Sequence, residues 1–311
     1  MQRRRGPFGG GNQWLNQTAD ALGRCGYALT HSLTNKVALV LGTHAGFGHA
    51  GLTFSYQDVL AAKARHHGLR CVQRINDNDL RKGTSEMDPH LAECNQAADH
   101  TVFVSQWLRD YHAEKWFDVS RPHSVITNGA DPSIFHPLGA RVWKVGQPLR
   151  ICTHHWSDNP AKGFPVYQEL DRLIASGEIT GVEFWVIGRW PKEIEWKATR
   201  TFAPCAGKQL ADILRQCHVC LSASRYEPGA MHPVEALACG LPLLYTPDTG
   251  GTVELGQNFG VPVTGQSLPA AIEHLRGNYQ SLRTRVLEEA PSGDQMCLAY
   301  RRLVQTLISN R

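Results

Sequence analysis

Two carboxylates, Glu227 and Glu235, lie eight residues apart in a stretch that is rich in Gly and Pro. Carboxylate oxygens accept hydrogen bonds from sugar hydroxyls, and two of them together can hold a vicinal diol. Gly229 lies between them and lets a bulky ligand approach the backbone closely. The alternative is structural, with Glu227 capping a loop and Glu235 as a solvated first-turn residue favoured by the helix dipole. These residues point to a site for a polyhydroxyl ligand.

The sequence around these carboxylates predicts a strand, a loop and a helix. Val219–Leu221 is a short apolar run typical of a buried strand, and Leu241–Tyr245 is a second one. Pro233 and Gly240 mark the first turn and the end of a helix between them. In an open parallel sheet, such a loop lies at the carboxyl end of a strand, where ligands bind, and the helix that follows offers free N–H groups to an anion. Both carboxylates are therefore expected to face one pocket.

Three segments carry a family resemblance: Glu227-Pro228-Gly229, the run from Glu235 to Pro242, and Gly250-Gly251. They resemble the donor-binding signature of retaining, nucleotide-sugar-dependent glycosyltransferases with the GT-B fold, in particular glycosyltransferase family 4 and its E-x7-E pair. The resemblance implies that Glu227 faces the transferred sugar and that Glu235 binds the ribose hydroxyls of the nucleotide. It also implies that the residues at the helix start line the donor site, namely Gly229, Ala230 and Met231.

A second group of residues is expected to hold the donor diphosphate. In the family, the loop after the first strand of the second domain carries an Arg and then a Lys-Gly. Lys162-Gly163 matches the Lys-Gly, whereas Trp156 stands at the position of the Arg. A pyrophosphate favours more than one cation. The candidates to replace the missing Arg are His155, Arg189 and Arg225. The loop Gly188-Arg189, after an apolar run from 182 to 187, corresponds to the family's base-binding loop.

A glycine-rich loop near the N-terminus contains Gly10 and Gly11 and precedes a predicted helix from Trp14 to Cys25. Such a loop has the general form of a phosphate-binding loop, although glycine turns before helices are also common for structural reasons. It resembles the loop that family members carry after their first strand, facing the donor diphosphate. The preceding strand would be Met1–Arg5.

Asn76 and Asp77 follow a predicted strand over Leu69–Ile75 and open a polar loop that ends at Gly83. Family members often have a His here that contacts the donor sugar. Asn or Asp can still hydrogen-bond a sugar or accept a proton from the acceptor. A purely structural turn is the alternative. A divalent metal is disfavoured because the sequence offers no third ligand, and GT-B enzymes usually work without a bound catalytic metal.

The length of 311 residues allows two domains. We expect an N-terminal, acceptor-side domain over residues 1–138, a linker to residue 148, and a donor-binding domain over 149–293. The last helix, 294–311, is expected to pack back on the first domain. Further strands are predicted at 36–42, 99–105, 149–153 and 261–263, and further helices at 57–67, 89–98, 208–216, 268–275 and 281–287.

The composition, with 42% hydrophobic and 19% charged residues, is that of a folded globular protein. A net charge of +4 without a nucleic-acid-binding motif fits anionic small molecules or anionic lipid better than DNA or RNA. No apolar run is long enough for a membrane span, and no secretory signal is recognised. We expect a cytoplasmic protein, with Arg3–Arg5 available for peripheral contact at the inner face of the membrane.

The cysteines and histidines do not form a convincing metal site. The nine cysteines include one close pair, Cys217 and Cys220. This pair is more typical of a buried strand than of half of a metal site. His154 and His155 are adjacent on a predicted strand and should point to opposite faces. We expect reduced thiols and no bound metal.

Together these features predict an α/β protein of the GT-B class, two Rossmann-like domains facing each other across a cleft. The expected activity is that of a hexosyltransferase of polysaccharide biosynthesis. A hexose would move with retention from a nucleoside diphosphate sugar, UDP- or GDP-linked, to a hydroxyl of a glycan or glycolipid, without a cofactor. The expected catalytic residues are Glu227, Asn76, Asp77 and Lys162.

Three other functions remain open. A GT-B epimerase or hydrolase would act on the same donors. A catalytically impaired sugar-nucleotide-binding or partner-binding module is suggested by Trp156 and Asn76, which stand where the family has Arg and His. An oxidoreductase is disfavoured, because no G-x-G-x-x-G follows a predicted strand.

Overall fold

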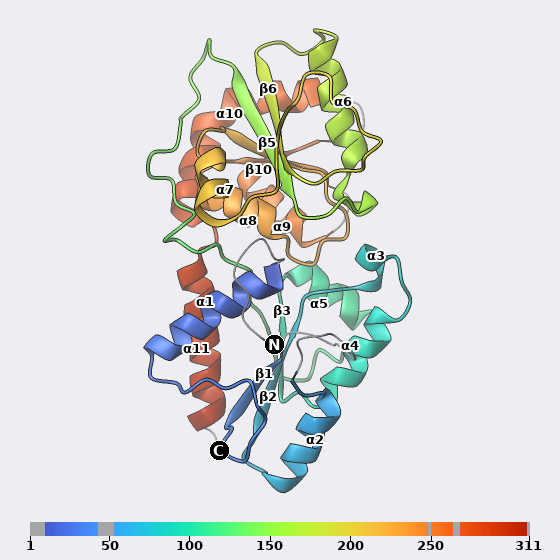
Figure 1. Cartoon of the computed structure of the whole chain (residues 1–311), viewed down its shortest axis with the longest axis vertical. Helices are drawn as coiled ribbons and strands as arrows, with labels where there is room; N and C mark the ends of the chain where they lie inside the picture. The colour runs from blue at the N-terminus through green and yellow to red at the C-terminus, as the bar shows by residue number, and fades with distance from the viewer. Residues whose placement is uncertain (1–9, 43–52, 248–249, 264–267, 310–311) are drawn as a thin grey trace. The chain divides into compact units, whose positions relative to one another are not determined.

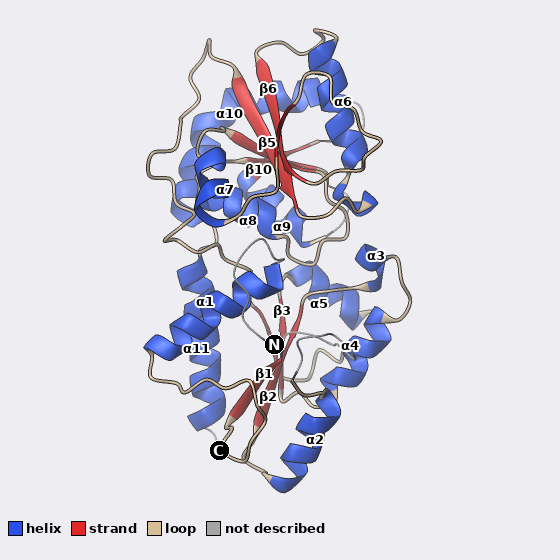
Figure 2. Cartoon of the chain, in the orientation of Figure 1, coloured by secondary structure: helices blue, strands red, loops and turns tan. Residues whose placement is uncertain are grey.

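The computed structural model describes residues 10–42, 53–247, 250–263 and 268–309. The chain divides into two compact units: unit 1 comprises residues 10–128 and 294 onward, and unit 2 comprises residues 129–293. Each unit has a sheet flanked by helices (Figure 2). The strand predicted at Met1–Arg5 lies outside the described residues.

Unit 1 contains a parallel sheet in the order β1-β2-β3-β4, as far as it is described. Its strands are β1 (Leu39–Gly42), β2 (Arg70–Ile75), β3 (His100–Phe103) and β4 (His123–Val125). Its helices are α1 (Gly10–Arg24), α2 (Tyr56–Arg65), α3 (Asp79–Lys82), α4 (Met87–Asn95), α5 (Gln106–Ala113) and α11 (Gly293–Ser309).

Helices cover both faces of this sheet (Figure 1). On one face, Trp14 of α1 and Tyr300 of α11 pack edge to face, with ring centroids 5.3 Å apart, over Val72 and Val102 of the strands. On the other face, α2, α4 and α5 cover the strands with a second set of buried apolar side chains. Strands buried on both faces are typical of parallel sheets, because their crossover connections place helices on each side.

Unit 2 contains a larger parallel sheet in the order β10-β9-β8-β5-β6-β7. Its strands are β5 (Leu149–His155), β6 (Val182–Gly188), β7 (Arg200–Phe202), β8 (Val219–Ser222), β9 (Leu243–Tyr245) and β10 (Gly260–Pro262). Its helices are η1 (Pro160–Lys162), α6 (Phe164–Ala175), α7 (Gly207–Leu214), α8 (Met231–Ala238), α9 (Gly251–Phe259) and α10 (Leu268–Glu289).

The two faces of this sheet are covered by different helices. α6 and α10 pack on one face through residues such as Tyr167 and Leu275. α7, α8 and α9 pack on the other through residues such as Leu210, Val234 and Phe259. The central strands β5, β6 and β8 are almost entirely buried. They lie where the sequence shows its strongest apolar runs.

The structure confirms the predicted α/β class and most predicted elements, with several differences. The polar loop after β2 contains the short helix α3, which the Asn78 side chain caps by accepting from the Arg81 N–H. The two helices predicted before the C-terminal helix are the single helix α10. Its Gly277 faces open space and the helix interior has no Pro, so nothing interrupts it. β4, α6 and β7 were not predicted. No helix within the described ranges is long and apolar enough to cross a bilayer.

Candidate active site

The order of strands in unit 2 reverses between β5 and β8. From β5 the chain moves outward through β6 and β7, then returns to β8 on the other side of β5 and continues to β9 and β10. In open parallel sheets, ligands bind at the carboxyl ends of the strands where the order reverses. The loops after β5 and β8 carry Lys162 and Glu227. The topology therefore brings these two predicted residues to one place.

Gly163 explains how closely the two loops approach. It adopts a left-handed conformation with φ 78°, and a Cβ atom there would lie 2.0 Å from the carbonyl oxygen of Ala223. Arg225 donates its backbone N–H to the Ala161 carbonyl at 2.8 Å. The Lys-Gly pair thus has a steric reason as well as a chemical one, because only glycine permits this contact.

The backbone of Glu227 is held from the opposite side by the Gly250-Gly251 turn. Gly251 donates its N–H to the Glu227 carbonyl at 2.7 Å, and a Cβ atom at Gly250 would lie 2.8 Å from the Glu227 nitrogen. The preceding residue, Tyr226, has a positive φ of 57°, which is uncommon for a bulky side chain. Such conformations persist only where the surroundings impose them, and they cluster at functional sites.

The side chains of Lys162 and Glu227 form an ion pair. Both are largely buried, with side-chain exposures of 12% and 6%. A buried ion pair needs both members, because either charge alone would be desolvated without compensation. The pair places a cation and a carboxylate side by side at the strand-order reversal.

The N-terminus of α8 follows this loop directly. Gly229 and Ala230 precede the helix, and Met231 is its first residue. Ala230, at the N-cap, has no side-chain acceptor for the first-turn N–H groups, which suits an anionic ligand. The helix begins two residues before Pro233. Glu235 is consequently its fifth residue, in the second turn, and the prediction of a first-turn position is wrong.

Glu235 is 1% exposed and lies next to a group of buried histidines. His154 Nε2 lies 3.4 Å from Glu235 Oε2 and 3.2 Å from the carbonyl oxygen of His232. His232 Nε2 lies 2.7 Å from the Ser222 hydroxyl. Burial lowers the pKa of His154 to about 4 and that of His232 well below its usual value. Both rings are therefore neutral near pH 7.

His155 faces the other side of β5. Its Nε2 lies 3.0 Å from the Tyr167 hydroxyl and 3.0 Å from the Thr153 hydroxyl. His154 contacts Glu235 of α8, whereas His155 contacts Tyr167 of α6, as expected for adjacent strand residues. Both rings also pack against His232, with centroids 5.9 and 5.1 Å away. β5 extends through both histidines, two residues beyond the strand predicted at 149–153. Burial lowers the pKa of His155 well below its usual value, so it is neutral and is a poor replacement for a phosphate-binding Arg.

Gly188 and Arg189 lie at the carboxyl end of β6, which pairs with β5. A Cβ atom at Gly188 would lie 2.0 Å from the His155 carbonyl oxygen, so strand packing alone requires a glycine there. Arg189 donates its backbone N–H to the same carbonyl at 3.0 Å, and its side chain is exposed. Their contact with the nucleotide base stays a prediction.

The sequence predicted that Gly10 and Gly11 lie in a loop before the first helix. In the structure they are instead the first two residues of α1, in unit 1. A Cβ atom at Gly11 would lie 3.9 Å from the side-chain nitrogen of Asn76, so this helix start lies beside the end of β2. Asp77 is 8% exposed, and its carboxylate lies 3.1 Å from Lys82 Nζ. The predicted glycine-rich segment and the predicted Asn76-Asp77 segment thus lie next to each other within unit 1.

Sequence reasoning did not identify several residues that support these loops. Tyr167 accepts the Ala223 N–H at 3.0 Å and belongs to α6, which was missed. His112, on α5, contacts the Asp77 carbonyl from 35 residues away. Periodicity marks both as core positions. Only the folded chain reveals which polar groups they meet.

The described residues contain no group of three or more His, Cys, Asp or Glu side chains arranged to hold a metal ion. Cys217 and Cys220 are fully buried, as expected for strand and core residues, and both thiols are free.

Unit 1 also contains a cavity of about 950 Å³. It lies between α1, β1 and α2, and α11 contributes Val304 and Ile308. Most of its lining is apolar, including Leu15, Leu22 and Val59. Cavities of this size and character commonly hold small organic ligands.

Comparisons with known proteins concern one domain and the fold. Residues 159–278 match the family model described as glycosyl transferases group 1. No curated protein matches the sequence significantly.

The structure is similar to several solved glycosyltransferase structures. Sucrose-phosphate synthase from Thermosynechococcus elongatus has a TM-score of 0.63 and 15% identity, with 88% of this chain and 74% of that chain covered. Anabaena HepE in complex with UDP and glucose has a TM-score of 0.63 and 14% identity, with coverages of 94% and 83%. Pneumococcal O-GlcNAc transferase GtfA in complex with UDP and GlcNAc has a TM-score of 0.61 and 14% identity, with coverages of 82% and 55%.

At these identities the likeness concerns the fold, and it confirms the predicted GT-B class with two Rossmann-like domains. The domain match covers the loops that carry Lys162 and Glu227. A glycosyl transferases group 1 match over residues 159–278, in a chain with the GT-B fold, supports a glycosyltransferase.

Proposed function

We propose that this protein is a retaining glycosyltransferase that moves a hexose from a nucleoside diphosphate sugar to a hydroxyl of a glycan or glycolipid. The observation that carries the proposal is the Lys162–Glu227 ion pair where the strand order of unit 2 reverses. The group 1 match supports it, as does the likeness to structures that contain UDP with glucose or GlcNAc.

In this proposal, the two charges of the ion pair have different partners in the donor. Lys162 binds the diphosphate, and Glu227 orients the hydroxyls of the sugar. The N-terminus of α8, at Gly229 to Met231, adds backbone N–H donors to the diphosphate. As the leaving group departs, the sugar centre becomes cationic and negative charge grows on the diphosphate. Stabilising that charge is the main catalytic task.

Other predicted residues complete the donor site in this proposal. Glu235 binds the ribose hydroxyls with its carboxylate oriented by His154, and the loop at Gly188 and Arg189 contacts the base. In unit 1, Gly10 and Gly11 present the start of α1 to the diphosphate.

We propose Arg225 as the second phosphate-binding cation in place of the family's Arg. Its backbone is hydrogen-bonded to Ala161, directly before Lys162, and its side chain is exposed. Its guanidinium lies 5.2 Å from the centroid of the Tyr226 ring, a contact that can orient it. His155 is buried and neutral and does not fit this role.

Asn76 and Asp77 are proposed to contact the donor sugar or the acceptor hydroxyl. Either side chain can hydrogen-bond a sugar, and the Asp77 carboxylate can accept a proton from the attacking hydroxyl. The apolar cavity of unit 1 favours the glycolipid alternative for the acceptor, because apolar walls bind a hydrocarbon chain better than a free glycan.

The first experiment is thermal unfolding of the full chain with UDP-, GDP-, ADP- and dTDP-sugars. A ligand at 100 times its Kd stabilises the native state by about 2.7 kcal/mol, so the correct donor raises Tm clearly. Transfer of labelled hexose from that donor to octyl glucoside and to glucose then tests the reaction, and NMR of the product tests retention. Failure of every donor to raise Tm at millimolar concentration would contradict the proposal.

Other outcomes of the same experiment identify other functions. Donor turnover that needs no acceptor favours an epimerase or hydrolase. Donor binding without transfer, unchanged in Glu227→Ala, favours a catalytically impaired binding module. Transfer to octyl glucoside well above transfer to glucose supports the glycolipid acceptor.

A further inference from the structure

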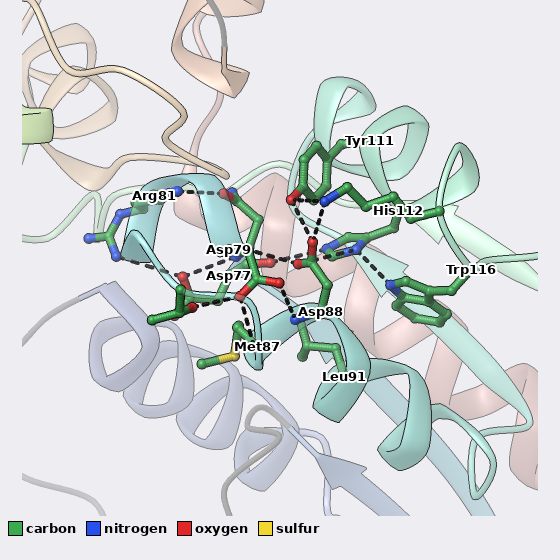
Figure 3. Close-up of polar contacts among 12 residues, drawn as sticks. Asp77, Asp79, Arg81, Met87, Asp88, Leu91, Tyr111, His112 and Trp116 are labelled. Atoms are coloured by element: carbon green, nitrogen blue, oxygen red, sulfur yellow. Dashed lines mark hydrogen bonds and ion pairs between the residues drawn. The ribbon is translucent and has the colours of Figure 1, made fainter.

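His112 lies fully buried on α5 and hydrogen-bonds through both ring nitrogens. Its Nε2 lies 3.1 Å from the backbone carbonyl oxygen of Asp77, and its Nδ1 lies 2.9 Å from Nε1 of Trp116 (Figure 3). The ring packs against Phe103, Tyr111 and Trp116, so it has no space to turn. The imidazole therefore links the core of unit 1 to the corner that follows β2.

The chemistry of these two partners determines which nitrogen carries the proton. An indole nitrogen only donates and a carbonyl oxygen only accepts. Nδ1 of His112 must therefore accept from Trp116, and Nε2 must carry hydrogen and donate to Asp77. Burial lowers the pKa of His112, and protonation of Nδ1 would also break its bond with Trp116. The ring is thus held as one neutral tautomer.

The Asp77 backbone is held by His112 while its carboxylate is held by α3. Asp77 Oδ2 lies 3.1 Å from Lys82 Nζ, and Oδ1 lies 3.7 Å from an Arg81 guanidinium nitrogen. Oδ1 also accepts the backbone N–H of Asn78 at 3.1 Å. With the carbonyl and the carboxylate of Asp77 both held, the peptide between Asp77 and Asn78 has little freedom, and this restrains the backbone at the corner that contains Asn76 and Asp77.

A second network fixes α3 itself. Asp79 accepts from the Thr84 hydroxyl at 2.6 Å and from the Met87 N–H at 2.8 Å (Figure 3). Asp88 accepts from the Tyr111 hydroxyl at 2.5 Å and from Lys115 Nζ at 2.8 Å. These bonds join the starts of α3 and α4 to α5, the helix that carries His112. The hydrogen-bond network that supports Asn76 and Asp77 is therefore continuous from α3 through α4 to α5.

We propose that His112 is a positioning residue: as a single neutral tautomer selected by Trp116, it sets the Asn76–Asp77 corner for sugar transfer. The inference rests on the proposed function, in which Asn76 and Asp77 contact the reacting sugar or the acceptor. Nothing in it requires His112 to touch a substrate.

The kinetic test compares two substitutions of His112. His112→Phe fills the space but removes the donor to Asp77, whereas His112→Gln keeps an N–H group. With the sugar nucleotide that raises Tm most among UDP-glucose and GDP-mannose, and octyl glucoside as acceptor, His112→Phe should lower kcat on the order of 100-fold. KM for the donor should change little, because the residues proposed to bind it most tightly belong to unit 2. His112→Gln should recover most of kcat.

A pH profile separates positioning from a purely structural role. Trp116→Phe frees Nδ1 to take a proton. Asp88 and Asp79 on α4 and α3 favour that charge, and Lys115 in the turn after α5 opposes it. The Tyr111 hydroxyl is neutral, because burial raises its pKa. Asp88 Oδ1 lies 3.9 Å from Nδ1. The kcat of Trp116→Phe should gain an ionisation between about pH 5 and 7 that the wild type lacks. A role confined to stability would lower Tm and leave the shape of the profile unchanged.

Nitrogen NMR of the histidine rings reads the tautomer directly and needs no activity. The expected wild-type spectrum has a protonated Nε2 and a bare Nδ1 for His112 from pH 8 to 6. A protonated Nδ1, or titration near pH 6.5, overturns the inference. Unchanged kcat in His112→Phe, with an active wild type, overturns it while the proposed function stands. A wild type that turns over none of the UDP-, GDP-, ADP- and dTDP-sugars overturns the proposed function and the catalytic role of His112 together, even where the NMR result agrees.

Discussion

At the scale of single residues, the main feature is the ion pair between Lys162 and Glu227. Each charge is largely buried, so each depends on the other or on a ligand of opposite charge. A diphosphate would offer Lys162 a stronger partner than Glu227, since phosphate oxygens carry more charge. Glu227 would then be released to bind sugar hydroxyls. This exchange would couple donor binding to the orientation of the sugar.

We expect Lys162→Met to weaken the binding of UDP or GDP, whichever the protein prefers, by roughly 10- to 100-fold, the worth of a charge-assisted hydrogen bond. Titration calorimetry at a temperature where the variant is folded by circular dichroism measures the change.

The matched control is Lys208→Met, at an exposed lysine of α7, which should bind the nucleotide as the wild type does. Equal losses in both variants, or none in Lys162→Met, would exclude Lys162 from the diphosphate site. The double variant Lys162→Met with Glu227→Gln should recover part of the Tm lost in Lys162→Met, since it leaves no uncompensated charge.

At the scale of elements, the candidate site depends on two loops that touch through a glycine. Gly163 lies against Ala223, and Tyr167 of α6 accepts the Ala223 N–H. The loop after β5, the loop after β8 and α6 are thereby fixed together. Lys162 and Glu227 meet because these backbone contacts hold their two loops together, and not only because their charges attract.

Gly163→Ala tests this packing, and Gly177→Ala is a control with nearly the same backbone. The φ angles are 78° and 77°, but a Cβ atom at Gly177 would meet nothing within 4 Å. Gly177→Ala should cost about 1–2 kcal/mol from the left-handed conformation alone. Gly163→Ala should cost about 3–4 kcal/mol, because the loops must also move apart.

Urea unfolding measures both glycine variants. Donor binding should be lost in Gly163→Ala and kept in Gly177→Ala. Similar costs for the two substitutions would contradict the close contact between the loops.

At the scale of the whole molecule, buried neutral histidines recur in both units. Buried histidines whose pKa values are lowered by burial are His112 in unit 1 and His154, His155, His218 and His232 in unit 2. None of these rings can be protonated without disturbing its surroundings. In the unfolded chain the same histidine rings can be protonated without this cost.

Stability should therefore fall in mildly acidic solution. The pKa of His154 is lowered from 6.5 to about 4 in the folded protein. Between these pH values the unfolded chain binds more protons than the native state. The free energy of unfolding is therefore highest above about pH 6.5 and decreases as the pH falls below it. By pH 4 the loss is roughly 3 kcal/mol for this one histidine.

Urea unfolding at pH 7.5, 6 and 5 measures this dependence. His154→Gln should reduce the slope with pH, whereas His67→Gln, at an exposed histidine, should not. A free energy of unfolding that is constant from pH 7.5 to 5 would show that these rings titrate normally.

Local sequence patterns predicted the candidate donor-side segments and most of the elements that carry them. Apolar runs predicted β2, β5, β6 and β8, and Pro233 and Gly240 framed α8 to within two residues. These signals are local: they depend on a few neighbouring residues and the backbone conformations those residues allow. The proposed function was inferred on the same basis, because Lys162-Gly163 and the Glu227–Glu235 segment are each contiguous in the chain.

Which loops meet, and which buried groups support them, depends on long-range packing. Lys162 and Glu227 are 65 residues apart, and His112 and Asp77 are 35 apart. The order of strands brings each pair together, and no local pattern encodes that order. The tautomer of His112 was likewise inaccessible, because it depends on Trp116 lying on one side of the ring and a backbone carbonyl on the other. Local propensity selects the elements, whereas long-range packing and the need to satisfy every buried polar group select their partners.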